Sequence, residues 1–304
     1  MKPPRVPPDW RHEHEPHDVA PVAARLETWG GRLIVSMPRT GSTLLGAVML
    51  LSGAFDRYLH EPAAPVFWDG LAPGGVLADQ GGAGPGDVIQ ESAYQFASAA
   101  LAGSFLDAAR APVVFTTRDP RLAWPSRWRL MFREWLDADP HDPDAGRLRA
   151  ALDADDFSEV GDLILGRVPQ PDHGLGAFLA LLEECDHRRQ GVLVVDNGRF
   201  RRDPGAALGR ICEAWEVPSH PGMASWPDLS AVLPRVVMTD LGRREYPWYY
   251  ARTLGSTGGI APERTEPLPL DRFPAVLRGE GARPLAIETA LAWHAALLDR
   301  PDAV

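Results

Sequence analysis

Residues 33–45 constrain the fold of this chain more than any other segment. They read Leu-Ile-Val-Ser-Met-Pro-Arg-Thr-Gly-Ser-Thr-Leu-Leu, which is an apolar run, a short loop and a second apolar run. The first run is typical of a buried parallel strand and the second of a helix. Backbone N–H groups meet where such a loop enters a helix, so the segment predicts a site for a phosphate or another oxyanion.

The loop itself carries the residue types that an anion needs. Thr40, Gly41, Ser42 and Thr43 can turn backbone N–H groups inward, and the last two add hydroxyl donors. Gly41 lets the backbone approach the anion closely, and Arg39 brings positive charge to the same point. The phosphate-binding loop of nucleotide kinases has a lysine before its Ser/Thr, which is absent here. The simpler interpretation is an ordinary strand–turn–helix with a glycine turn.

Apolar runs alternate with helical patterns along the chain. This alternation predicts a three-layer α/β/α fold around a central, mainly parallel sheet. We expect 21–304 to form a single domain, with a helical insertion around 128–190 that breaks near 139–143 and 169–173. The predicted strands are 31–37, 56–60, 112–117 and 192–195, and the predicted helices are 22–28, 41–52, 91–109, 204–216 and 284–298.

Three other stretches lack regular patterns. Residues 1–20 are rich in proline and histidine, and we expect them to be disordered or to wrap over the surface. Residues 70–86 consist largely of Gly, Ala, Pro and Asp, which fits either a lid over a site or a mere insertion. Residues 217–275 contain many prolines.

Composition limits the partners. The chain has 304 residues and a formal net charge of -10, which disfavours a general nucleic-acid binder. Lys2 is the only lysine, so arginine must supply any cationic group in a site. Cys185 and Cys212 lie in apolar patterns that favour buried free thiols, and no metal-ligand spacing is present. No run approaches about 20 apolar residues, so we expect a cytoplasmic protein without a membrane span.

A second segment also suggests anion binding. The apolar run that ends at Thr117 is followed by Arg118, Asp119 and a helix start, and Ser126 lies eight residues after Arg118. A guanidinium at a strand end and a hydroxyl on the next helix can grip a phosphate, in the crevice where ligands bind open α/β sheets. The simpler interpretation is an Arg118–Asp119 surface pair at a helix start.

Together the two segments resemble sulfotransferases that use 3′-phosphoadenosine 5′-phosphosulfate (PAPS), of the bacterial small-molecule type. The resemblance covers residues 30–217, and weakly continues to 256. Residues 192–215 are similar to the family's late strand–loop–helix, but Asp196-Asn197-Gly198 stands where members often have a Tyr-Glu-Asp-like stretch. The resemblance implies a fold like that of the P-loop nucleotide hydrolases.

The resemblance also implies roles for individual residues. The loop with Arg39, Thr40, Gly41, Ser42 and Thr43 would hold the 5′-phosphosulfate. Arg118 and Ser126 would hold the 3′-phosphate. The reaction would transfer a sulfuryl group to the hydroxyl of a small-molecule acceptor and release adenosine 3′,5′-bisphosphate, and no metal is expected.

An attacking hydroxyl must lose its proton, so a base is expected near the loop. Glu61 matches the Glu-Pro element of some bacterial sulfotransferases, and His60 has the more suitable ordinary pKa. Adjacent side chains of a strand point to opposite faces, so one of the two is expected to face the site. The pair also fits a polar strand end without a catalytic role.

The acceptor side is less specific. Trp124, Trp128, Phe132 and Trp135 fall close to helical spacing, which fits an acceptor pocket but is more typical of a core. Two other functions remain open. One is an ATP-dependent small-molecule kinase with a degenerate loop, for which Asp196 is a candidate Mg²⁺ ligand. The other is a non-catalytic nucleotide-binding domain.

Overall fold

The computed structural model describes residues 18–96, 98–170, 172–263, 265–278 and 286–304, so most of the predicted N-terminal segment 1–20 lies outside the described residues. Within them, one six-stranded sheet has the order β5-β4-β1-β3-β2-β6. Every strand pair is parallel, which confirms the predicted fold class. The strands are β1 (Arg32–Ser36), β2 (Arg57–His60), β3 (Asp87–Ser92), β4 (Val113–Thr117), β5 (Val192–Asp196) and β6 (Val236–Met238).

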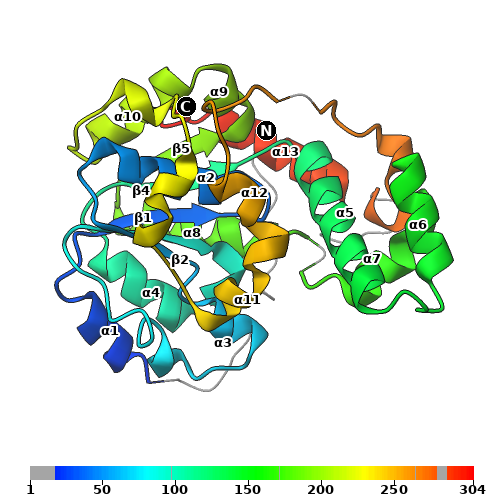
Figure 1. Ribbon diagram of the computed structural model, residues 1–304, viewed down its shortest axis with the longest axis horizontal. Coiled ribbons are helices and arrows are strands. Elements are labelled where there is room, and N and C mark those ends of the chain that lie inside the picture. The colour runs from blue at the N-terminus through cyan, green and yellow to red at the C-terminus, as the bar shows by residue number, and fades with distance from the viewer. Residues whose placement is uncertain (1–17, 97, 171, 264, 279–285) are drawn as a thin grey trace.

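Helices cover both faces of the sheet (Figure 1). Side chains alternate along each strand, so Leu33 and Val35 of β1 join one core and Ile34 joins the other. The first core packs against α1, α4, α8 and α13, and the second packs against α2, α10 and α12. The helices are α1 (Ala20–Leu26), α2 (Ser42–Met49), α3 (Ala64–Trp68), α4 (Ala99–Ala108), α5 (Pro120–Ala138), α6 (Ala145–Ala154), α7 (Gly161–Arg167), α8 (Leu175–Arg188), α9 (Asn197–Arg202), α10 (Pro204–Ala214), α11 (Asp240–Tyr249), α12 (Ala251–Leu254) and α13 (Ile287–Leu298).

The helical region between β4 and β5 has two parts. The helices α5, α6 and α7 project to one side of the sheet (Figure 1). By contrast, α8 returns to the sheet, where Phe178 packs edge-on against Phe115 of β4 with ring centroids 5.2 Å apart. The predicted breaks near 139–143 and 169–173 fall between α5 and α6 and between α7 and α8.

The strand order creates a crevice beside β1. From β1 the chain builds β2 and β3 on one side and then crosses to place β4 on the other. Such a switch point separates the loops that follow the two adjacent strands, and ligands of open α/β sheets bind there. The loop with Arg39 follows β1 and Arg118 follows β4, so the topology brings both predicted anion-binding segments to one place.

Two elements differ from the sequence-based expectation. The predicted helix 91–109 was wrong at its start, because residues 87–92 form β3 and the helix α4 begins at Ala99. Residues 236–238 form the edge strand β6 in a region without a clear pattern. All six residues of β3 are buried, and its polar side chains include Gln90, which donates to Ser36 Oγ and accepts from Tyr58.

Residues 80–86, the second part of the stretch 70–86, lie at the opposite end of the sheet from the crevice. Arg57, at the start of β2, pairs with Asp87, at the start of β3, over 2.5 Å. The same guanidinium donates to the carbonyl groups of Gln80 and Gly82. Residues 80–86 are therefore tied to the amino ends of the strands and are no lid over the crevice.

The packing of α8 on the sheet predicts a large stability difference between two leucine substitutions. Leu181 is 1% exposed in the core, so Leu181→Ala should lower the free energy of unfolding by about 2–5 kcal/mol. Leu71 is 43% exposed, and Leu71→Ala should stay within about 0.5 kcal/mol. Urea denaturation measures both, and equal effects would contradict this packing.

Candidate functional site

The loop after β1 has a strained backbone. Arg39 has φ 65° and Gly41 has φ 87°, both in the left-handed region. Glycine adopts this region freely, whereas arginine does not, and strain of this kind gathers at functional sites. A Cβ atom at Gly41 would lie 2.1 Å from Nδ2 of Asn197, so only glycine fits there. Gly41 is the N-cap of α2, and no side chain caps this helix.

Three successive carbonyl groups of the loop are held by side chains from three different elements. Because a trans peptide unit is planar, a held carbonyl also fixes the N–H of the next residue, which points in the opposite direction. The N–H groups of Arg39, Thr40 and Gly41 are thereby oriented as a set. The bonds run from His173 Nε2 to Pro38 O (3.0 Å), from Arg118 Nη1 to Arg39 O (3.1 Å) and from Asn197 Nδ2 to Thr40 O (2.8 Å).

A cavity of about 880 Å³ opens beside this loop. Its size is in the range of small-molecule and cofactor sites. Gly41, Ser42 and Thr43 line it at the start of α2. The charged side chains in its lining are six arginines and three glutamates, namely Arg39, Arg118, Arg127, Arg167, Arg201, Arg252, Glu61, Glu134 and Glu263. Positive charge therefore exceeds negative charge here, although the whole chain is acidic.

The two predicted anion-binding segments meet in this cavity. Arg39 Nε donates to Ser126 Oγ of α5 over 3.3 Å, and Arg118 donates to the carbonyl of Arg39. Arg118 also pairs with Glu263, from Nη2 to Oε2 over 2.5 Å. Its Nε atom is buried without a hydrogen-bond partner among the described residues.

Glu61 lies at another part of the same cavity, directly after β2. Its φ of 46° is again left-handed. Ser92 Oγ donates to Oε1 over 3.0 Å, and the hydroxyl of Tyr250 donates to Oε2 over 3.1 Å. The carboxylate is thus oriented by donors from β3 and from the start of α12 while one side faces the cavity.

A second carboxyl group lies beneath Glu61. Glu91 of β3 is fully buried and accepts from the backbone N–H groups of Ala63 (2.6 Å) and Ser92 (2.9 Å). Burial raises the pKa of Glu91 well above its ordinary value, and the nearby charge of Glu61 acts in the same direction. The two carboxyl groups are therefore electrostatically coupled.

His60 lies behind the loop and outside the cavity lining. It is 1% exposed, and its ring packs between those of Tyr58 and Tyr250, with centroids 5.5 Å and 4.3 Å away. Its Nε2 lies 3.3 Å from Thr43 Oγ1. Burial lowers the pKa of His60, so the ring is neutral at neutral pH. Its position fits a support for Thr43.

Thr40 also directs its side chain away from the cavity. Its hydroxyl donates to the Met37 carbonyl over 2.8 Å and lies 2.7 Å from Thr116 Oγ1 of β4. Of the predicted site residues, the cavity lining brings together Arg39, Gly41, Ser42, Thr43, Glu61, Arg118 and Ser126. The side chains of Thr40 and His60 stay outside it.

Several site residues carried no clear signal in the sequence. These residues are His173, Asn197, Arg201 and Tyr250, and they come from three segments that only the fold brings together: the turn before α8, α9 and the start of α12. Asn197 had the best available signal, because it lies two residues after the end of the predicted strand 192–195. The aromatic stripe is mostly core, since Trp124, Trp128 and Phe132 are buried, whereas Trp135 lines the cavity.

The described residues contain no group of three or more His, Cys, Asp or Glu side chains that could hold a metal ion. Asp196 caps α9 by accepting from Arg199 N and also pairs with His294 Nε2 over 3.0 Å. Among the described helices none is long and apolar enough to cross a membrane. No family model, curated protein or solved structure matches this chain.

The contact between His173 and the loop predicts a pH dependence of stability. Burial, and then the charge of Arg127, lower the pKa of His173 well below its ordinary value. The unfolded chain takes up this proton below about pH 6.5 while the folded chain does not, so stability falls by up to about 1.4 kcal/mol per pH unit below that point.

His173→Gln keeps a hydrogen-bond donor but does not titrate, so the free energy of unfolding of this variant should fall less between pH 7 and pH 5. Urea denaturation of both proteins between pH 7 and pH 5 measures the difference. If the free energy of unfolding fell equally with pH in the two proteins, the lowered pKa of His173 would be contradicted.

Proposed function

We propose that this protein is a sulfotransferase, which moves a sulfuryl group from PAPS to a hydroxyl of a small-molecule acceptor. The observation that carries the proposal is the meeting of two anion-binding segments in one cavity, where Arg39 bonds to Ser126 and Arg118 bonds to the Arg39 backbone. Two phosphate groups on one nucleotide require two such segments at a fixed separation. The donor would supply an activated sulfuryl group on a phosphate leaving group.

The residues present fit such a donor. The cavity of about 880 Å³ is large enough for a nucleotide and an acceptor. The oriented N–H groups of the loop, with Ser42, Thr43 and Arg39, suit a 5′-phosphosulfate. Arg118 has a buried, unsatisfied Nε, and Ser126 adds a hydroxyl. Both suit a 3′-phosphate.

The charge on the transferred group favours sulfuryl over phosphoryl transfer. Phosphoryl-transfer enzymes normally add Mg²⁺ and a lysine to neutralise a multiply charged group. A sulfuryl group carries less charge, so Arg39 and backbone donors suffice to stabilise the phosphate that leaves. In this proposal the acceptor oxygen forms the new S–O bond as the S–O bond to the 5′-phosphate breaks.

Glu61 is the proposed base. It lines the cavity and is held by Ser92 and Tyr250, whereas the ring of His60 is buried behind Thr43. The acceptor hydroxyl would give its proton to Glu61 as the oxygen attacks. Ser92 and Tyr250 act as positioning residues, because they hold the carboxylate in one direction.

Calorimetry with nucleotides tests the donor class. We expect adenosine 3′,5′-bisphosphate to bind more tightly than ADP or ATP, with no requirement for Mg²⁺. Arg118→Ala should weaken its binding by about 10- to 100-fold, because hydrogen bonds to charged groups are worth about 1.5–3 kcal/mol.

Arg121→Ala is the matched control, since Arg121 pairs with Asp119 outside the cavity lining. Preference for ATP with Mg²⁺ would favour the kinase instead. An unchanged dissociation constant in Arg118→Ala would refute the 3′-phosphate assignment.

Turnover tests the base. PAPS is incubated with a library of hydroxylated small molecules, and mass spectrometry identifies acceptors that gain one sulfuryl group. On the best acceptor, Glu61→Gln should lower kcat by about 10²–10⁴-fold, the usual contribution of a general base. Binding of adenosine 3′,5′-bisphosphate should not change.

Glu183→Gln, on the exposed side of α8, controls for loss of a carboxylate. Donor binding without transfer to any acceptor, together with indifference to Glu61→Gln, would identify a non-catalytic binding domain.

A further inference from the structure

Arg201 of α9 is a second guanidinium beside Arg118. Both line the same cavity. Arg201 Nε donates to Asn197 Oδ1 over 2.9 Å, and Nη1 donates to the Ala261 carbonyl over 2.8 Å. The described residues offer its Nη2 no hydrogen-bond partner. The side chain is therefore held in place by two bonds, and the two N–H groups of its Nη2 remain available to a ligand in the cavity.

One carboxylate, Glu263, lies near both guanidinium groups and contacts one of them. Glu263 pairs with Arg118, and its charge also acts on Arg201. Burial and the like charge of Arg118 lower the pKa of Arg201, while Glu263 opposes this shift. The carboxylate carries one negative charge against two positive charges, so this part of the cavity keeps an excess of positive charge.

Glu263 comes from an extended segment that crosses the molecule. This segment, coloured orange in Figure 1, passes α9 and continues toward the α5–α7 group. The side chains of Arg118 and Glu263 are 14% and 22% exposed, so the pair is largely shielded but still reaches solvent. A carboxylate in such a position can move from the arginine into solvent when an anion of higher charge binds the arginine.

We infer that Arg118 and Arg201 together form a binding site for a phosphate monoester dianion, and that Glu263 occupies this site until the phosphate displaces it. A phosphate monoester carries a charge of about -1.5 to -2 at pH 7 and three acceptor oxygens. It therefore satisfies two guanidinium groups better than one carboxylate does. If the proposed function holds, this phosphate is the 3′-phosphate of the donor, and Arg201 is a further donor-binding residue.

The competing explanation is structural. Glu263 and Arg201 would then merely fasten the extended segment to Arg118 and α9, and removal of either side chain would weaken binding of any nucleotide through loss of order. The two explanations predict opposite signs for Glu263→Gln. Displacement predicts tighter phosphate binding, because the competing carboxylate is gone, whereas fastening predicts weaker or unchanged binding.

The test compares adenosine 3′,5′-bisphosphate with adenosine 5′-monophosphate by calorimetry. Glu263→Gln should tighten binding of the bisphosphate by about three- to tenfold. Arg201→Gln should weaken it by about tenfold or more. Neither variant should change binding of the monophosphate by as much, because that ligand lacks the 3′ group.

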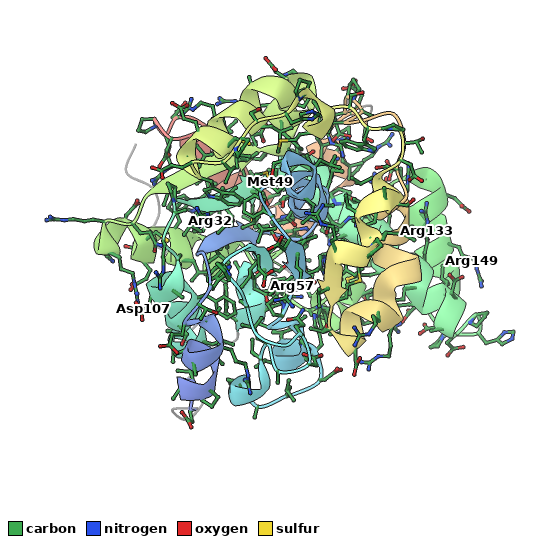
Figure 2. All side chains as sticks on the ribbon, turned by 60° about the vertical axis from the view of Figure 1, so that its left-hand side comes forward. Arg32, Met49, Arg57, Asp107, Arg133 and Arg149 are labelled. Atoms are coloured by element: carbon green, nitrogen blue, oxygen red, sulfur yellow. The ribbon has the colours of Figure 1, made fainter. Side chains whose placement is uncertain are left out.

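Arg201→Lys keeps the charge without the planar fork and should fall between Arg201→Gln and the unaltered protein. Arg133→Gln is the control, because it removes one charge from an exposed position of α5 outside the cavity lining; Figure 2 labels this residue. Weaker or unchanged binding of the bisphosphate to Glu263→Gln would overturn displacement. Equal weakening of both ligands by Arg201→Gln would overturn the role of Arg201.

A third ligand separates this inference from the proposed function. If the unaltered protein binds none of these nucleotides, inorganic phosphate is titrated and followed by ³¹P line broadening. Phosphate binding that Arg201→Gln weakens and Glu263→Gln strengthens would support the dianion site, even though the donor proposal had failed. Phosphate binding that is absent, or indifferent to both variants, would overturn the site itself.

Discussion

The structure of the candidate site depends on three side chains that hold successive carbonyl groups of the loop after β1. A loop of this length has more than one way to turn its peptide planes, and Arg39 in a left-handed conformation is costly by itself. The three bonds select one loop conformation, because each fixes one peptide plane and hence one N–H direction. Arg118 directly follows β4, Asn197 directly follows β5, and His173 lies in the turn before α8, which packs on the same sheet. The orientation of the loop is therefore a property of the whole fold.

Arg118 connects this scaffold to the charge of the cavity. One of its nitrogens holds the Arg39 carbonyl and another meets Glu263. A single guanidinium thus both shapes the loop and presents charge beside it. Because the chain is acidic overall, the field of the whole protein does not attract an anion, and affinity must come from donors at short range. Arginine suits this task, since its planar fork can bond in two directions at once.

The parts of the fold and site that follow from local sequence could be predicted. The strands β1, β4 and β5 are short apolar runs, and the residues at their carboxyl ends are chemically distinctive. Parallel strands bring those ends to one edge, so the meeting of Arg39, Arg118 and Ser126 required only the sheet and the strand order.

The parts that depend on tertiary contacts could not be predicted. The strand β3 was missed, and its last two residues were placed in a helix, because Gln90, Glu91 and Ser92 are polar yet buried and only their long-range partners explain them. The same holds for Thr40, whose hydroxyl turns toward β4, and for His173, which lies 135 residues from the carbonyl that it binds.

The segment that follows α11 contacts charged side chains at both ends of the cavity. Hydrogen bonds between these contacts fasten the segment, so one end can rearrange while the other stays in place. Tyr250 orients Glu61, and Glu263 meets Arg118. Between them, the Ser256 carbonyl accepts from two donors, Leu229 N and Trp226 Nε1, and Ile260 N donates to the Ala224 carbonyl. These bonds fasten the chain before Glu263 is reached, and Leu268 N is fastened again to the Arg121 carbonyl. Exchange of the Glu263 carboxylate for a phosphate therefore needs movement only between these anchors. The base at Glu61 can stay oriented while the donor end of the cavity is filled.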